Sequence, residues 1–211
     1  MAIGVLCTTA VRTSAQSPPV IHGDAATTVG WLSSNIPSQE PYDHNNWLSS
    51  LFGAASLGWH WTDNLKSEID VGVGTETRAD RSEQVVIAGR IQYLPVRGRF
   101  SRRTVGVSQQ YQFFHNVWFH PHLAAGANVT WERRTAEYGP IYFYDDITRS
   151  SRLIPSERDR EEERTLTVRP FVAFGFKAYM TDRVFFRNDM RVAFRGGPDE
   201  TLLRLGLGVD F

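Results

Sequence analysis

The sequence predicts an all-β fold, an eight-stranded antiparallel up-and-down transmembrane β-barrel. Three observations lead to this prediction. Segments of about ten or more residues alternate between apolar and polar side chains, the periodicity of a strand with two unlike faces. Ionised residues within these segments stay on the polar rows. The connections between the segments are alternately short and long, as in membrane barrels with short turns at one end and longer loops at the other.

The last segment, residues 202–211, gives the clearest alternation. It reads LLRLGLGVDF, and its polar row contains Arg204 and Asp210. The segment ends on an aromatic residue that is in phase with the apolar row, whereas a soluble domain usually ends on a few frayed polar residues. The apolar row is Leu203, Leu205, Leu207, Val209 and Phe211.

Composition narrows the class of protein. The chain has 211 residues, a length that suits a single barrel. Its 23 basic and 23 acidic residues cancel, so we expect no nucleic-acid partner. No run of about 18 apolar residues occurs, which excludes a membrane-spanning helix but not a membrane barrel, whose signal per strand is much weaker.

Residues 1–15 (MAIGVLCTTAVRTSA) resemble the apolar part of a signal peptide. Thr13 and Ala15 are small residues placed as for cleavage before Gln16. The basic n-region is missing, as it would be from a truncated signal peptide; an ordinary first strand is the alternative. The sole cysteine, Cys7, falls in this segment, so the mature chain would have no disulfide or cysteine-bound metal. We assign residues 16–26 to a periplasmic N-terminal lead and 27–211 to the barrel.

The alternation predicts eight strands in order along the chain. Tight turns are expected near 62–64, 115–116 and 180–182, and long loops at 36–46, 78–102 and 134–164; part of the second, 85–92, could be a hairpin arm beyond the barrel. The expected strands are 27–34, 47–61, 65–77, 104–114, 117–133, 165–179, 183–194 and 202–211.

Alternation alone does not tell which face points outward. A soluble barrel would put its apolar face inside, but here the apolar rows of most strands lack ionised residues. Contact with lipid requires this, because a charge at the bilayer midplane costs about 2–4 kcal/mol. The polar rows would then line the lumen. The predicted lumen charge network is Lys66, Glu68, Asp70, Glu76, Arg169, Lys177, Arg187, Asp189, Arg191 and Arg204.

Aromatic residues gather at the strand ends on the apolar face, with aliphatic and small residues between them. Two aromatic bands around an aliphatic belt are typical of the two interfaces of a membrane barrel. The predicted girdles consist of Trp47, Trp59, Trp61, Tyr111, Phe119, Trp131, Phe176, Phe186 and Phe194.

With these features together, residues 27–211 resemble the small eight-stranded bacterial outer-membrane β-barrel proteins, the group of OmpA-, OmpX- and OmpW-like barrels. The terminal pattern of Leu207, Val209 and Phe211 is similar to the signal that the barrel-assembly machinery reads in that group. The resemblance implies a monomer in the outer membrane of a Gram-negative-type bacterium. It implies as partners outer-membrane lipid, lipopolysaccharide, the barrel-assembly machinery and periplasmic chaperones.

An eight-stranded barrel is just wide enough for side chains to fill it. We therefore expect a polar, filled lumen and a structural or surface-binding role. A narrow, OmpW-like channel for small solutes is the alternative, and a lipid A-modifying enzyme is a lesser one, since no G-x-S-x-G motif occurs.

No catalytic residue, cofactor or metal ligand is assigned. His60, His120 and His122 could ligate zinc, but interior hydrogen bonding is the favoured interpretation. The charged segment 157–164, with Arg149 and Arg152, could contact lipopolysaccharide or an external ligand, although a solvated loop is the simpler interpretation.

Overall fold

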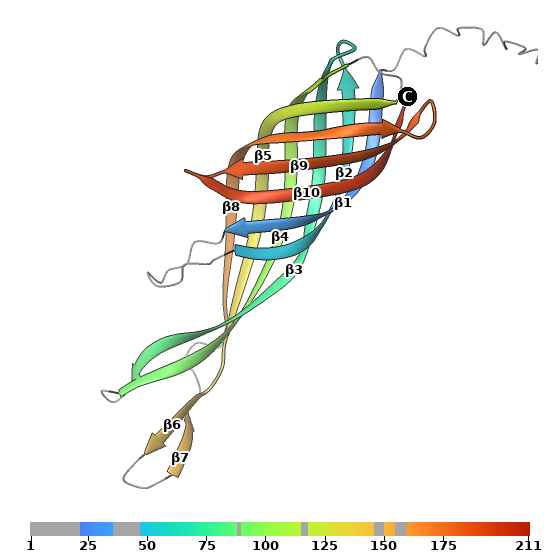
Figure 1. The fold of residues 1–211 in the computed structure, drawn as a ribbon. Coiled ribbons are helices and arrows are strands. Elements are labelled where there is room, and N and C mark those ends of the chain that lie inside the picture. The colour runs from blue at the N-terminus through green and yellow to red at the C-terminus, as the bar shows by residue number, and fades with distance from the viewer. Residues whose placement is uncertain (1–21, 36–46, 88–89, 115–117, 146–149, 155–159) are drawn as a thin grey trace, which may run out of the picture.

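The computed structural model describes residues 22–35, 47–87, 90–114, 118–145, 150–154 and 160–211. Eight strands close into an antiparallel barrel, with the order β1-β10-β9-β8-β5-β4-β3-β2 (Figure 1). The predicted fold class is confirmed. Within the described residues, no helix is long and apolar enough to cross a membrane. The expected signal peptide, residues 1–15, lies outside the described residues.

Along the chain, the barrel strands form two groups. Between the groups lies a small two-stranded sheet of β6 (Ile141–Asp145) and β7 (Ser150–Ile154). The barrel strands are β1 (Gly23–Asn35), β2 (Trp47–His60), β3 (Leu65–Ile87), β4 (Arg90–Gln112), β5 (Phe119–Tyr138), β8 (Arg160–Tyr179), β9 (Val184–Phe194) and β10 (Pro198–Asp210).

The barrel closes where β1 pairs with β10. The backbone amide of Phe211 donates to the Gly23 carbonyl at 2.9 Å, and the Gly23 amide donates back at 3.0 Å. β1 therefore starts at Gly23 rather than at Thr27, and residues 23–26 of the expected periplasmic lead belong to the barrel. The start of β1 could not be recognised from the sequence, because its outward row begins with Ala25 and Thr27, which give no strong apolar signal.

The apolar rows face outward and the polar rows face inward. Val71 and Leu123 are both 52% exposed on the outer wall, whereas Lys66 is 0% and Arg187 3% exposed. This arrangement is the reverse of a soluble barrel, whose apolar side chains fill the interior. It matches the orientation predicted from the placement of charges along the strands.

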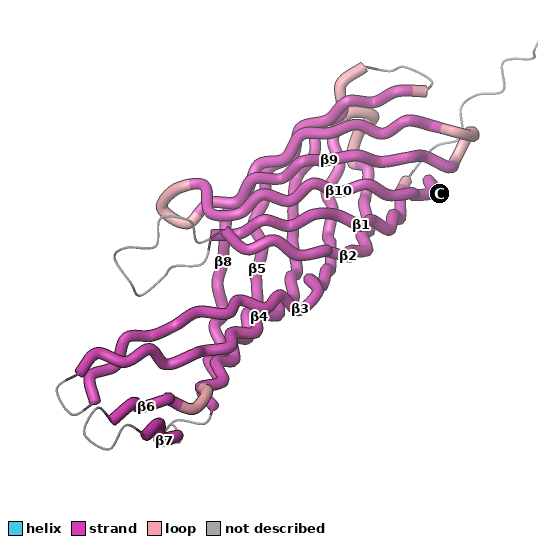
Figure 2. The backbone as a smooth tube through the Cα atoms, turned by 60° about the horizontal axis from the view of Figure 1, so that its bottom comes forward, coloured by secondary structure: helices cyan, strands magenta, loops and turns pink. Residues whose placement is uncertain are grey.

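Four strands continue beyond the barrel as a twisted sheet, hereafter the extension (Figures 1 and 2). β3 and β4 pair from Thr77 and Phe100 to Ile87 and Arg90, and β5 pairs with β8 as far as Glu137 and Arg160. Residues 78–87 and 90–102 are thus strand, as the hairpin arm considered for 85–92 would be, and not the long loop expected. Periodicity failed there because neither face of the extension has a continuous apolar row.

Inward-facing glycines make room for large interior side chains. A Cβ atom on Gly72 would overlap the ring of Phe52, and one on Gly106 would overlap the carboxylate of Asp70. In a lumen this narrow, large side chains such as these fit because the neighbouring strand has a glycine beside them.

We predict that Gly72→Val destabilises the barrel, because the new side chain would push against Phe52 in the packed interior. Overpacking of this kind costs about 1–3 kcal/mol. The matched control is Gly53→Val on the outer wall, where an added Cβ meets nothing within 4 Å. Urea unfolding of the refolded proteins, followed by tryptophan fluorescence, should show a lower midpoint for Gly72→Val alone. Equal midpoints would contradict the packing described.

Candidate functional site

Most charged side chains at mid-strand positions of the barrel point into its interior. Of the predicted lumen residues, all but Glu76 are 0–3% exposed. They come from β3, β8, β9 and β10, where alternation turns every second side chain inward. The structure brings these together: Lys66, Glu68, Asp70, Arg169, Lys177, Arg187, Asp189, Arg191 and Arg204.

Glu76 does not belong to this set, so its predicted place in the lumen was wrong. Its side chain is 48% exposed and lies 4.0 Å from Arg78. The cause is a bulge: Gly74 pairs with Arg102 and Thr77 with Phe100, so β3 has one more residue than β4 between these pairs. An extra residue reverses the inward and outward phase of the strand beyond it.

One network of ion pairs begins at the end of the lumen nearest the short turns. The Lys66 ammonium donates to Asp24 Oδ2 at 2.9 Å and to Glu68 Oε2 at 2.8 Å. Lys177 also donates to Asp24, so this carboxylate is held between two ammonium groups. Asp210 lies 3.6 Å from the Lys177 ammonium. Each buried charge here has an opposite charge beside it, as burial requires.

The same network continues through the middle of the barrel. Arg187 donates to Glu68 at 2.7 Å and to Asp189 at 2.9 Å. Arg204 donates to Asp189 at 2.8 Å and to Asp70 at 3.1 Å. These arginines cross-link β3, β9 and β10 with charge-assisted hydrogen bonds.

Aromatic rings extend this network. Arg191 donates to Asp70 at 3.1 Å, and its guanidinium lies 3.8 Å from the ring centre of Phe171. The Lys177 ammonium lies 4.2 Å from the ring centre of Phe185, a residue that is fully buried. Cations over aromatic faces are stabilised without a further carboxylate.

The network that starts at Asp24 is electrically neutral. It contains five carboxylates and five cations among the described residues. The carboxylates are Asp24, Glu68, Asp70, Asp189 and Asp210, and the cations are Lys66, Lys177, Arg187, Arg191 and Arg204.

A second network fills the lumen toward the extension. Arg102 donates to Glu132 at 2.9 Å and to Glu200 at 2.5 Å. Arg169 donates to Glu132 at 2.9 Å and to Asp199 at 3.0 Å. These pairs join β4, β5, β8 and β10 around the mouth of the barrel. No ion pair between described residues connects this network with the first.

A layer that is apolar on β1, β2, β8, β9 and β10 lies between the two networks; on β4 and β5 the same level holds Thr104 and Thr130. On β10, Leu202 stands between Glu200 of the second network and Arg204 of the first; on β8, Phe171 lies between Arg169 and Lys177. Two buried clusters make up this layer. They are Leu32, Phe52 and Leu202 from β1, β2 and β10, and Phe171, Ala173 and Ala193 from β8 and β9.

Several lumen residues were not among those that the sequence predicted. Asp24 precedes the first strand that we expected, Arg102 was placed in a loop, and Glu200 preceded the last expected strand. Glu132 and Asp210 stood on polar rows but had no assigned partner. Continuing the two-residue alternation past the expected ends of the first and last strands would have placed Asp24 and Glu200 on the lumen side.

The three strand histidines do not converge. His122 is buried on β5, whereas His60 Nε2 lies 3.4 Å from Asp24 Oδ2 and the His120 ring lies 5.2 Å from that of Tyr179. Among the described residues, metal-ligand spacing is found for Asp24, His60 and Asp210. Two lysines already bind Asp24, and their positive charge opposes a metal cation there.

The predicted girdle residues lie on the outer wall. Trp59 and Trp61, near the short turns, are 52% and 63% exposed, and Trp131, near the extension, is 48% exposed. At the turn end three rings form a row across β5, β8 and β9: Phe119 is 5.1 Å from Phe176, which is 6.2 Å from Phe186. The others, Trp47, Tyr111 and Phe194, are exposed or half-buried on the same wall. Leu207, Val209 and Phe211 are also exposed there.

We predict that Asp24→Asn strongly destabilises the protein, because it removes the carboxylate between Lys66 and Lys177. Breaking a buried ion pair by removing one partner costs about 3–5 kcal/mol. Asp63→Asn in the exposed turn is the matched control and should leave the free energy of unfolding unchanged. Denaturant unfolding in lipid vesicles measures both; a loss no larger than that of the control would show that the lysines do not depend on Asp24.

Solved structures resemble this barrel, whereas protein-family models and curated protein sequences give no match. Neisserial surface protein A superposes with a TM-score of 0.54 at 14% identity, over 90% of this chain and 96% of that chain. The N-terminal β-barrel domain of OprF from Pseudomonas aeruginosa gives 0.51 at 14% identity, over 90% and 98%. The outer membrane protein OprG from the same organism gives 0.50 at 12% identity, over 90% and 97%. The chain has the fold of the small eight-stranded outer-membrane β-barrel proteins.

Proposed function

We propose that the protein is an outer-membrane barrel with a sealed lumen and that it acts at the cell surface in a structural or binding role. The observation that supports this most is the filling of the interior by two ion-pair networks with an apolar layer between them. The membrane placement is supported by the exposed apolar wall and by the shared fold.

The interior opposes ion flow in two ways. A permeating ion would have to break short charge-assisted pairs such as Arg187 with Glu68, at 2.7 Å. It would then have to lose its hydration to pass Leu32, Phe52 and Leu202. A wide polar channel would instead leave charged side chains exposed to water along its length.

The extension is the part of the protein best placed to meet an external partner. It projects from the end of the barrel opposite the C-terminus (Figure 1). One row across its four strands alternates in charge: Asp80, Arg97, Glu137 and Arg160 are in register. A charged sheet of this kind suits recognition of polar surface molecules better than transport.

Biogenesis fits the same proposal. Leu207, Val209 and Phe211 form an exposed apolar row at the end of β10, beside the seam with β1. We infer that the barrel-assembly machinery reads this row after periplasmic chaperones deliver the chain. Interior charge pairing needs no second subunit, which supports a monomer.

A narrow channel for small solutes remains the second candidate, on one observation. On the neighbouring strands β4 and β5, Gln110, Gln112 and His122 are buried with side-chain polar atoms that have no protein partner. Buried polar atoms of this kind are usually satisfied by water. A hydrated strip along this wall would be the path of such a channel. The lipid A-modifying alternative has no comparable observation in its favour among the described residues.

Planar-bilayer recording separates the first two candidates. We predict that the refolded protein gives no steady conductance, because the apolar layer blocks the lumen. A shift in electrophoretic mobility between boiled and unboiled samples serves as the control that the inserted protein is a folded barrel. Stable openings from folded protein would overturn the sealed lumen and favour the channel.

A further inference from the structure

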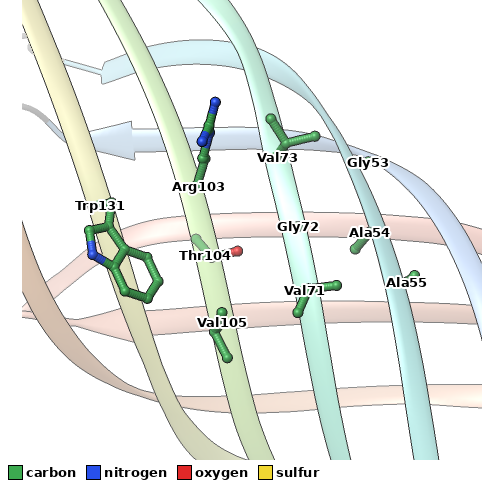
Figure 3. Close-up of a pocket in the computed structure, with 10 residues that line it drawn as sticks. All are labelled: Gly53, Ala54, Ala55, Val71, Gly72, Val73, Arg103, Thr104, Val105 and Trp131. Carbon is green, nitrogen blue, oxygen red and sulfur yellow. The ribbon is translucent and has the colours of Figure 1, made fainter.

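The outer wall has a shallow groove where β2, β3, β4 and β5 run side by side near the extension (Figure 3). Its volume is about 500 Å³. Gly53 and Ala55 form a low floor on β2, because small side chains leave the wall hollow, and Val71 and Val73 line it on β3. Trp131 flanks it on β5.

Arg103 lies at this groove in a place where the wall is otherwise apolar. It is in register with Val73 on one side and with Trp131 on the other. Its side chain is exposed, and it makes no ion pair with another described residue. An unpaired cation on a lipid-facing row is costly, unless it reaches the headgroup level or meets an anion.

Two further arginines lie just beyond the groove, on the same face of the sheet. Arg133 and Arg164 face each other across β5 and β8, two residues beyond Trp131 and Leu166, the next pair on this face. Both bind Glu162, at 2.7 Å and 2.8 Å.

The arginine cluster stays positive overall. The hydrogen bonds from Arg133 and Arg164 lower the pKa of the Glu162 carboxyl, so this group is ionised at neutral pH. Glu162 and Glu76, whose charge also acts on Arg133, are two carboxylates beside five arginines, so the net charge stays positive. The arginines are Arg78, Arg103, Arg133, Arg160 and Arg164. Diagonal neighbours such as Arg103 and Arg133 have their Cα atoms about 7–8 Å apart on an antiparallel sheet, a separation that one phosphate group can bridge.

We propose that this groove and its arginines bind the phosphorylated end of lipid A, the lipid anchor of lipopolysaccharide. An acyl chain lies along the valines and the small floor residues, against Trp131. A phosphate accepts hydrogen bonds from Arg103 and Arg133. The site lies on the extension side of the barrel, which is the outer leaflet under the membrane placement proposed above; the inference rests on that placement.

Lipid A supplies both features that the site presents. A free phosphate would satisfy the arginines and leave the groove empty, whereas an uncharged acyl lipid would fill the groove and leave Arg103 unpaired. Lipid A also carries several acyl chains and two phosphates on one disaccharide headgroup, which suits an apolar groove bordered by more than one arginine. Phosphatidylglycerol offers only one phosphate.

Binding of purified bis-phosphorylated lipid A to the detergent-refolded protein, measured by native mass spectrometry, tests the proposal. Arg103→Gln should weaken binding about tenfold, the effect of losing one charge-assisted contact. Arg195→Gln is the matched control, since Arg195 is an exposed arginine in the β9–β10 connection, away from the groove. Dephosphorylated lipid A should bind the parent protein more weakly than lipid A binds Arg103→Gln, because it loses the contact with Arg133 as well.

Several results would overturn this site. They are equal binding by Arg103→Gln and parent protein, an equal loss in Arg195→Gln, tight binding of the dephosphorylated lipid, and full competition by inorganic phosphate or by phosphatidylglycerol at equal concentration. Heat-dependent mobility of each variant shows that the barrel is folded. The mass-spectrometric result is read separately from conductance, so a failed lipid site is distinguishable from a failed sealed lumen.

Discussion

The pairing of buried charges is the constraint on which the rest of this structure depends. Once the apolar rows face outward, each strand must turn its ionised residues into a lumen with little room for water. Arg187 and Arg204 are tolerable there only because Glu68, Asp189 and Asp70 receive their hydrogen bonds. The plugged interior, and glycines such as Gly106 beside Asp70, follow from satisfying those charges at once.

Much of this architecture is readable from the sequence, because one face of each barrel strand is uniformly apolar. The inward placement of Lys66 and Arg187 follows from two-residue alternation alone. Partners do not follow, since which residues meet across a lumen depends on the stagger of the strands. The pairing of Arg102 with both Glu132 on the next strand and Glu200 across the barrel could not be foreseen from spacing.

The predictions from the sequence that were wrong also have physical causes. Alternation gives a weak signal where charged residues interrupt both faces of a sheet, and Leu94 and Val96 form only a short buried cluster there. The segment from 78 to 102 was therefore expected as loop. At Glu76 the strand keeps going but gains one residue, and a pattern of period two cannot reveal which side of the bulge a residue is on. Gly74, beside the bulge, was the available hint, since glycine within a strand often marks such a site.

The seam between β1 and β10 has a consequence for how the protein is made. Asp24 faces Asp210 across it, and Lys177, from a third distant strand, lies beside both. Contacts this far apart in the chain form late and slowly, because the whole loop between them must be closed first. During synthesis the early strands have no partner for their edges, and Asp24 of β1 lacks its partner Lys177. The nascent polypeptide therefore has to be kept from collapsing or aggregating until translation has delivered its final strand.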